Sequence, residues 1–179
     1  MNERNRRPCV LILMGSDSDL PIMAESARIL EKLQVPYELE VTSAHRSPER
    51  TVELVRGADE RGVKVFVVGA GGAAHLAGVV AAHTRLPVLA APLASSELHG
   101  LDALLATVQM PAGIPVGCLA VGKAGATNAA LLACQILGLA DSDLADRLAT
   151  YRREMAEGVS KKSEKAKKTL ASILDGGKK

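Results

Sequence analysis

The sequence predicts a doubly wound α/β fold built on a five-stranded parallel sheet. Strand-like and helix-like segments alternate five times along the chain, and the strand exits are rich in Gly and Ser. The runs at 10–14 and 63–68 are wholly apolar, which is typical of parallel strands buried on both faces. Together these features favour three layers, αβα, with the flavodoxin-like strand order 2-1-3-4-5.

The remaining elements follow from local patterns. Residues 37–41 alternate between apolar and acidic side chains, which indicates a half-buried strand near an edge of the sheet. Pro21 and Pro48 each suit the first turn of a helix, and Ser47 suits the N-cap of the second one. We expect helices at 22–33, 48–62, 73–84, 101–108 and 127–137, strands at 88–91 and 114–121, and an extra C-terminal helix at 141–158.

The length of 179 residues fits one domain with two flanking segments. We expect a flexible N-terminus at 1–8, a single catalytic domain at 9–158, and a basic tail at 159–179 that is partly helical or disordered. The last 30 residues hold nine Lys or Arg against four Asp or Glu, although the net charge of the chain is only +2. The apolar stripe of the C-terminal helix, and the helix at 127–137 that is apolar almost all round, predict a homo-oligomer.

Composition also limits the location and the partners. No apolar run is long enough to span a membrane, and the N-terminus lacks the apolar segment of a signal peptide, so we expect a cytoplasmic protein without a membrane partner. Cys9, Cys118 and Cys134 are widely spaced in apolar surroundings, as is usual for buried thiols in a reducing compartment. With three aromatic side chains and no Trp, the chain lacks platforms for base stacking, so we expect no nucleic-acid partner.

The turn at 15–19 is the first candidate site. A strand end that meets a helix start exposes unpaired N–H groups and a positive helix pole, which together favour a bound phosphate. Ser16 and Ser18 can add hydroxyl donors. Asp17 and Asp19 would repel a phosphate, so at least one of them should face other groups, such as ribose hydroxyls.

Four histidines are candidates for proton transfer, because imidazole titrates near neutral pH. His45 follows a strand at the predicted switch point beside Arg46 and a loop serine, a grouping that suits an anion site with an attached acid–base group. His75 opens the helix after the glycine run at 69–72, where it can act chemically or simply cap or pack. His83 and His99 lie farther from strand exits, and we expect them on the surface.

The sequence supports no metal site and no organic cofactor. No His or Cys cluster has zinc spacing. The glycine run at 69–72 does not match the G-x-G-x-x-G pattern, and no acidic residue follows at the distance that a dinucleotide site requires. The residues therefore indicate a phosphorylated small molecule and a histidine proton shuttle.

Five motifs in order resemble the family of N5-carboxyaminoimidazole ribonucleotide mutases, the catalytic subunit of class I phosphoribosylaminoimidazole carboxylase. They are Met-Gly-Ser-Asp-Ser-Asp at 14–19, Ser-Ala-His-Arg-Ser-Pro at 43–48, Gly-Ala-Gly-Gly-Ala-Ala-His-Leu at 69–76, Gln-Met-Pro-Ala-Gly-Ile-Pro-Val-Gly at 109–117 and Gly-Lys-Ala-Gly-Ala-Thr-Asn-Ala-Ala-Leu-Leu at 122–132. The resemblance covers roughly residues 9–155. A second branch of the family carboxylates aminoimidazole ribonucleotide directly with CO2. Its members have Ala-His-Lys where this chain has Ala-His-Arg, and they lack the run at 71–75.

The resemblance implies an isomerase of purine (IMP) biosynthesis that moves a carboxylate from the exocyclic amine to ring carbon 4 without ATP, metal or cofactor. It also implies an octamer and a functional link to an ATP-dependent synthetase of the substrate. His45 would carry the proton, Asp19 would bind the ribose, and residues 109–114 would cover the site. The other substrate-binding residues that it implies are Ser16, Ser18, Ser43, Arg46, Ala70, Gly71, Gly72, His75 and Leu76.

Three alternatives stay open. The first is direct carboxylation of aminoimidazole ribonucleotide with CO2. The second is a flavodoxin-like module that binds a nucleotide without turnover. The third is nucleic-acid binding through the basic tail, which would show strong salt dependence.

Overall fold

The computed structural model describes residues 7–176, so most of the expected N-terminal segment and the last three residues of the expected tail lie outside it. Its sheet has five parallel strands in the order β2-β1-β3-β4-β5, which confirms the predicted topology. The strands are β1 (Val10–Met14), β2 (Tyr37–Val41), β3 (Val65–Gly71), β4 (Val88–Leu93) and β5 (Gly117–Cys118).

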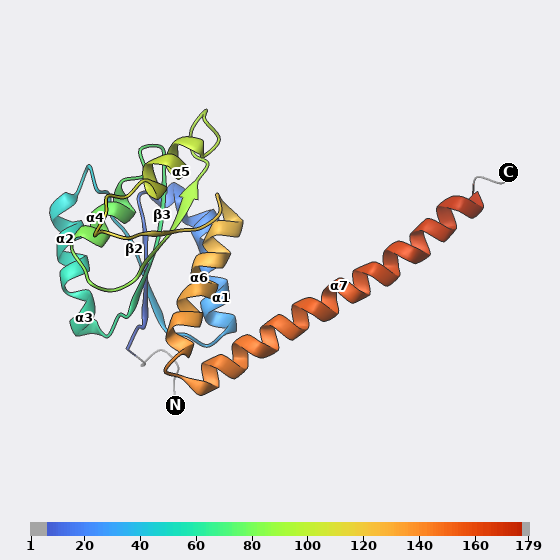
Figure 1. Cartoon of the computed structure of the whole chain (residues 1–179). Coiled ribbons are helices and arrows are strands. Elements are labelled where there is room, and N and C mark those ends of the chain that lie inside the picture. Colours follow the sequence, from blue (N-terminus) through green and yellow to red (C-terminus); the bar gives the residue numbers. More distant parts are fainter. Residues whose placement is uncertain (1–6, 177–179) are drawn as a thin grey trace. The chain divides into compact units, whose positions relative to one another are not determined.

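Helices cover both faces of this sheet, as Figure 1 shows for α1 and α6 on one side and α2, α3 and α4 on the other. Residues of α2, α3, α4 and α5 join one face of the sheet in a single apolar cluster that includes the fully buried Phe66. The helical elements are η2 (Asp17–Asp19), α1 (Leu20–Lys32), α2 (Pro48–Arg56), α3 (Ala58–Arg61), α4 (Leu76–Ala82), α5 (Leu101–Val108), α6 (Lys123–Gly138) and α7 (Ser142–Gly176).

Burial explains why the strands lie where they do. All five residues of β1 are buried, as a strand with a neighbour on each side and helices on each face must be. Strand β2 is only half-buried and forms one edge, as its alternating pattern predicts. Because β1 lies between β2 and β3, the chain segments that follow these three strands meet at one end of the sheet.

Element boundaries differ from the expected ones where Pro and Gly intervene. Only Gly117 and Cys118 pair with β4, so β5 is far shorter than the expected strand at 114–121. Pro115 has no N–H to donate to a ladder and so delays the pairing. The glycine run at 69–72, at the end of β3, is called the glycine exit below. Helix α4 begins at Leu76 instead of 73, since this segment contains Gly72 at a φ of +60°.

The chain divides into two compact units, residues 1–137 and 138–179. The second unit contains α7, which runs through Gly158, where the sequence predicts its end. A Cβ at Gly158 would meet no atom within 4 Å, so this glycine costs the exposed helix only about 0.5–1 kcal/mol relative to Ala and does not end it. Within the described residues no helix is long and apolar enough to cross a membrane.

Gly125 makes a close contact that gives a stability prediction. A Cβ built on this buried residue of α6 would overlap the carbonyl of Ala120, and backbone cannot move aside as a flexible side chain can. We expect Gly125→Ala to lower the free energy of unfolding by about 1–3 kcal/mol, the usual cost of overpacking. Thermal unfolding should show a lower Tm for this variant and no decrease for the control Gly158→Ala. An unchanged Tm for Gly125→Ala would contradict the close packing of α6.

Candidate active site

A cavity of about 420 Å3 lies at the carboxyl ends of the strands, where ligands bind in doubly wound sheets. Four chain segments contribute to it, each of them following one of the strands β1 to β4. Its lining consists of Gly15, Ser16, Ser18, Asp19, Ser43, Ala44, His45, Arg46, Ala70, Gly71, Ala73, Ala74, His75, Leu76 and Ser95. Ten of the eleven site residues expected from the sequence are in this set; Gly72 is not.

The turn after β1 is held by reciprocal hydrogen bonds. The backbone N–H of Ser16 donates to Oδ2 of Asp19 at 3.1 Å, and the N–H of Ser18 donates to Oγ of Ser16 at 3.3 Å. This capping box fixes Asp19, which is only 7% exposed, at the cavity wall. Burial raises the pKa of the Asp19 carboxyl above its ordinary value of 3.8, although hydrogen bonds from Ser16 and Gly15 oppose this shift.

The raised pKa of Asp19 predicts a pH dependence of stability. The folded state binds this proton more tightly than the unfolded state does, so the contribution of Asp19 is most favourable below its unfolded pKa and is lost as pH rises through the folded pKa. We expect the stability of the wild type, relative to Asp19→Asn, to improve as pH falls from about 7 to about 3. Urea unfolding of both proteins across this range measures the difference. A difference that moves the opposite way would show that the hydrogen bonds, and not burial, dominate.

The loop after β2 is built around two serines. Ser47 is the N-cap residue of α2, as predicted, but its side chain forms no capping hydrogen bond. Its Oγ instead accepts a hydrogen bond from the backbone N–H of Ser43 at 3.0 Å and closes the loop. Oγ of Ser43 accepts from the N–H groups of His45 at 3.4 Å and Arg46 at 3.2 Å, so the loop geometry sets the direction of both side chains.

Arg46 joins this loop to the turn after β1. Its Nη2 donates to the carbonyl of Gly15 at 3.3 Å, and Gly15 N–H donates in turn to the carbonyl of Gly69 at 3.3 Å. The predicted proximity of these three strand exits is therefore confirmed. Among the described carboxylates none forms an ion pair with Arg46, so its charge is available to an anionic ligand.

His45 and His75 contact each other in the cavity. Nε2 of His45 lies 2.7 Å from Nδ1 of His75, and the two rings meet edge to face at 81°. At this distance one ring nitrogen carries a hydrogen and the other accepts it, and the tautomers decide which is the donor. The two histidines are 30 positions apart in the chain, and no local pattern predicts their contact.

The glycine exit of β3 packs against a residue that the sequence does not single out. A Cβ on Gly71 would overlap Oγ of Ser95, so a larger residue at position 71 would require the serine or the backbone to move. The lining does not include residues 109–114, which were expected to cover the site. Met110 of that segment lies instead near α4, where a Cβ on Gly78 would be 3.2 Å from its Sδ. His83 and His99 are exposed, as expected.

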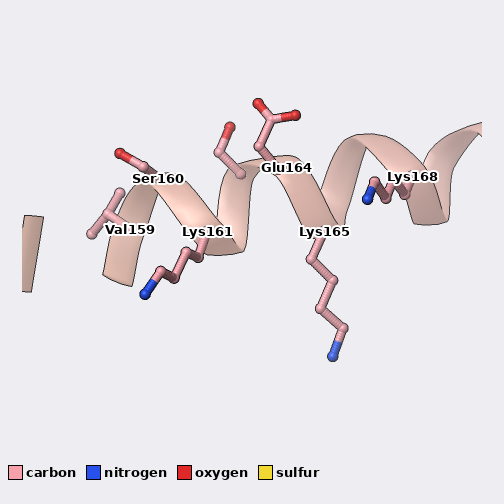
Figure 2. Close-up of a pocket in the computed structure, with 7 residues that line it drawn as sticks. Val159, Ser160, Lys161, Glu164, Lys165 and Lys168 are labelled. Atoms are coloured by element: carbon pink, nitrogen blue, oxygen red, sulfur yellow. The ribbon is translucent and has the colours of Figure 1, made fainter. Parts of the chain in front are cut away.

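Two other hollows lack comparable chemistry. One, of about 690 Å3, is lined only by residues 159–168 of α7, so a single helix bounds it (Figure 2). Another, of about 500 Å3, contains His83 and Arg85 near the end of α4. Within residues 7–176 no three His, Cys, Asp or Glu side chains come together as possible metal ligands.

A parallel α/β protein that gathers serines, two imidazoles and an arginine without a described ion-pair partner at its strand ends has the features of an enzyme for a small phosphorylated substrate. Comparison with known proteins makes the class specific. The chain belongs to the AIR carboxylase family, whose model matches residues 9–158.

Named relatives cover most of the chain. It is 50% identical to the N5-carboxyaminoimidazole ribonucleotide mutases of Pyrococcus horikoshii over 162 residues (90% of each chain) and of Escherichia coli K12 over 159 residues (89% of this chain and 94% of the relative). The mutase of Mycobacterium tuberculosis H37Rv is 46% identical over 173 residues, which cover 97% of this chain and 98% of the relative. Among solved structures, Treponema denticola PurE superposes with a TM-score of 0.79 at 29% identity, covering 89% of this chain and 98% of that one.

Proposed function

We propose that this chain converts N5-carboxyaminoimidazole ribonucleotide to 4-carboxyaminoimidazole ribonucleotide in purine biosynthesis, as an isomerase. The observation that carries the proposal is the His45–His75 pair in one cavity with Arg46, within a chain about half identical to enzymes of that name. In this proposal residues 9–158, the stretch that the family model matches, form the catalytic domain.

The nucleotide would lie across the strand ends. Arg46, Ser18 and Ser43 are the charged and hydroxyl groups suited to the phosphate. Asp19, whose Oδ2 accepts from the N–H of Ser16, would accept hydrogen bonds from the ribose hydroxyls. Ser16 supports this arrangement, because its hydroxyl accepts from Oγ of Ser18 at 2.9 Å.

The base would lie against the glycine exit and the histidine pair. Ala70, Gly71 and Leu76 line this end of the cavity with small or apolar groups, so a carboxylate could approach the backbone there. Gly72 has no side chain there and contributes only through the course of the loop.

The reaction requires the enzyme to donate one proton to the substrate and later to remove one from it. The bond between the exocyclic nitrogen and the carboxylate carbon breaks, CO2 departs, and His45 gives a proton to that nitrogen. Carbon 4 then attacks CO2, a carbon–carbon bond forms, and the proton on carbon 4 returns to imidazole, so the net proton count is zero. His75, whose Nδ1 lies 2.7 Å from Nε2 of His45, would orient the imidazole that gives the proton in the first step and takes one back in the last.

A substrate comparison tests the proposal. Purified protein should convert N5-carboxyaminoimidazole ribonucleotide without ATP and should act far more slowly on aminoimidazole ribonucleotide with bicarbonate. Rapid turnover of the second mixture alone would favour direct carboxylation, and turnover of neither would favour a binding module. Because His45 is followed by Arg46 and the run at 71–75 is complete, we expect the first outcome.

We further propose a homo-oligomer, specifically an octamer, in the cytoplasm. Leu101, Leu105 and Val108 form a stripe along α5 and are 56%, 53% and 49% exposed, which is unusual for a monomer surface. Light scattering on the purified protein measures the subunit number. The proposed function also implies a functional link to an ATP-dependent enzyme that synthesises the substrate.

A further inference from the structure

We infer that Ser95 is a further substrate-contacting residue, whose hydroxyl donates a hydrogen bond to the carboxylate that the reaction moves. The inference rests on the proposed function and assigns a role to a residue outside the expected site. It follows from the position of Ser95, from its lack of hydrogen-bond partners among the described residues and from the part of the cavity that it occupies.

The backbone places Ser95 beside the glycine exit. Leu93, the last residue of β4, pairs with Gly71 of β3, and Ser95 follows two residues later. The N–H of Ser95 donates to the carbonyl of Leu93 at 3.1 Å, so a tight turn directs the side chain back toward the sheet edge. There Ser95 lines the cavity and its Oγ occupies the place that a Cβ on Gly71 would take.

The adjacent residue, Ser96, is a serine whose hydroxyl has a structural role. Oγ of Ser96 donates to Oδ2 of Asp102 at 2.6 Å and accepts from the N–H of Leu98 at 3.2 Å, which ties the loop to the start of α5. The hydroxyl of Ser95 forms no hydrogen bond with the described residues. Of two adjacent serines, one is used by the fold and the other faces the cavity unpaired.

The sheet order indicates which part of the nucleotide Ser95 can reach. Strands β4 and β2 are three positions apart, about 14 Å at the usual strand spacing, so Ser95 lies far from Ser43 and Arg46 at the phosphate end. It is adjacent to Gly71, whose backbone belongs to the proposed carboxylate end. A hydroxyl donor to a carboxylate is a charge-assisted hydrogen bond, and the Ser95 proton stays on its oxygen throughout.

Binding of two ligands that differ only by the carboxylate tests this role. In Ser95→Ala we expect the Kd for 4-carboxyaminoimidazole ribonucleotide to rise about 10- to 100-fold, the usual effect of losing a hydrogen bond to a charged group. The Kd for aminoimidazole ribonucleotide, which has no carboxylate, should change less than about threefold on the same grounds. Ser95→Thr, which keeps a hydroxyl, should recover part of the discrimination.

Ser96→Ala is the matched control, because it removes a hydroxyl one residue away that the fold uses. It should lower Tm without changing the ratio of the two Kd values. Equal weakening of both ligands by Ser95→Ala, or no weakening of either, would overturn the inference. If the wild type failed to convert N5-carboxyaminoimidazole ribonucleotide, the proposed function itself would fail, whatever the Ser95 variants bind.

Discussion

Replacing His45 with Asn is expected to lower kcat by about 10²- to 10⁴-fold, the usual contribution of a general acid–base group. Asparagine keeps a polar side chain of similar reach but cannot gain or lose a proton near neutral pH. The backbone N–H groups of His45 and Arg46 that bind Ser43 are unaffected by this change, so the phosphate end of the cavity should survive. Steady-state kinetics should therefore show a large loss in kcat with little change in nucleotide affinity.

His75→Asn tests what the second histidine of the pair contributes to activity. Because Nδ1 of His75 lies 2.7 Å from Nε2 of His45, this variant removes the hydrogen-bond partner of the His45 ring and should shift the pH–rate profile. His99→Asn, at an exposed site outside the cavity lining, is the control and should retain wild-type kinetics. Full activity in His45→Asn would leave the proposed mechanism without its proton carrier, and would favour a module that binds without catalysis.

Gly71→Ala is expected to reduce kcat/KM by about 10²-fold or more, since displacements near 1 Å in an active site have effects of this size. The added methyl group would overlap Oγ of Ser95, lie 2.8 Å from its Cβ and lie 3.1 Å from the carbonyl oxygen of Leu93. Either the glycine exit or the turn after β4 must therefore move, and both belong to the cavity wall. Kinetics of the purified variant, together with its Tm, measure the effect.

Gly72→Asn distinguishes this steric clash from backbone strain. Gly72 has a φ of +60°, which asparagine tolerates better than most residues do, and a Cβ there would meet no atom within 4 Å. We expect a loss at least about tenfold smaller than for Gly71→Ala, because no clash adds to the strain. Similar losses in the two variants would show that the glycine exit needs flexibility more than it needs space.

Long-range strand order was predictable because buried parallel strands have a strong local signature. The apolar run of β1, the alternation in β2 and the glycine exit of β3 each depend on residues close together in the chain, and the observed order agrees with the expected one. Boundaries were less predictable. Pro115 shortens β5, and Gly158 leaves α7 unbroken because it has no neighbours that force a turn.

By itself, the sequence determined which residues follow the strands, and hence the composition of the site: serines, Asp19, Arg46, His45 and small residues. Only the tertiary structure decided which of these side chains touch. The His45–His75 contact and the position of Ser95 against Gly71 each join segments from different strand exits. Such contacts depend on the twist and spacing of the whole sheet, which no short stretch of sequence specifies.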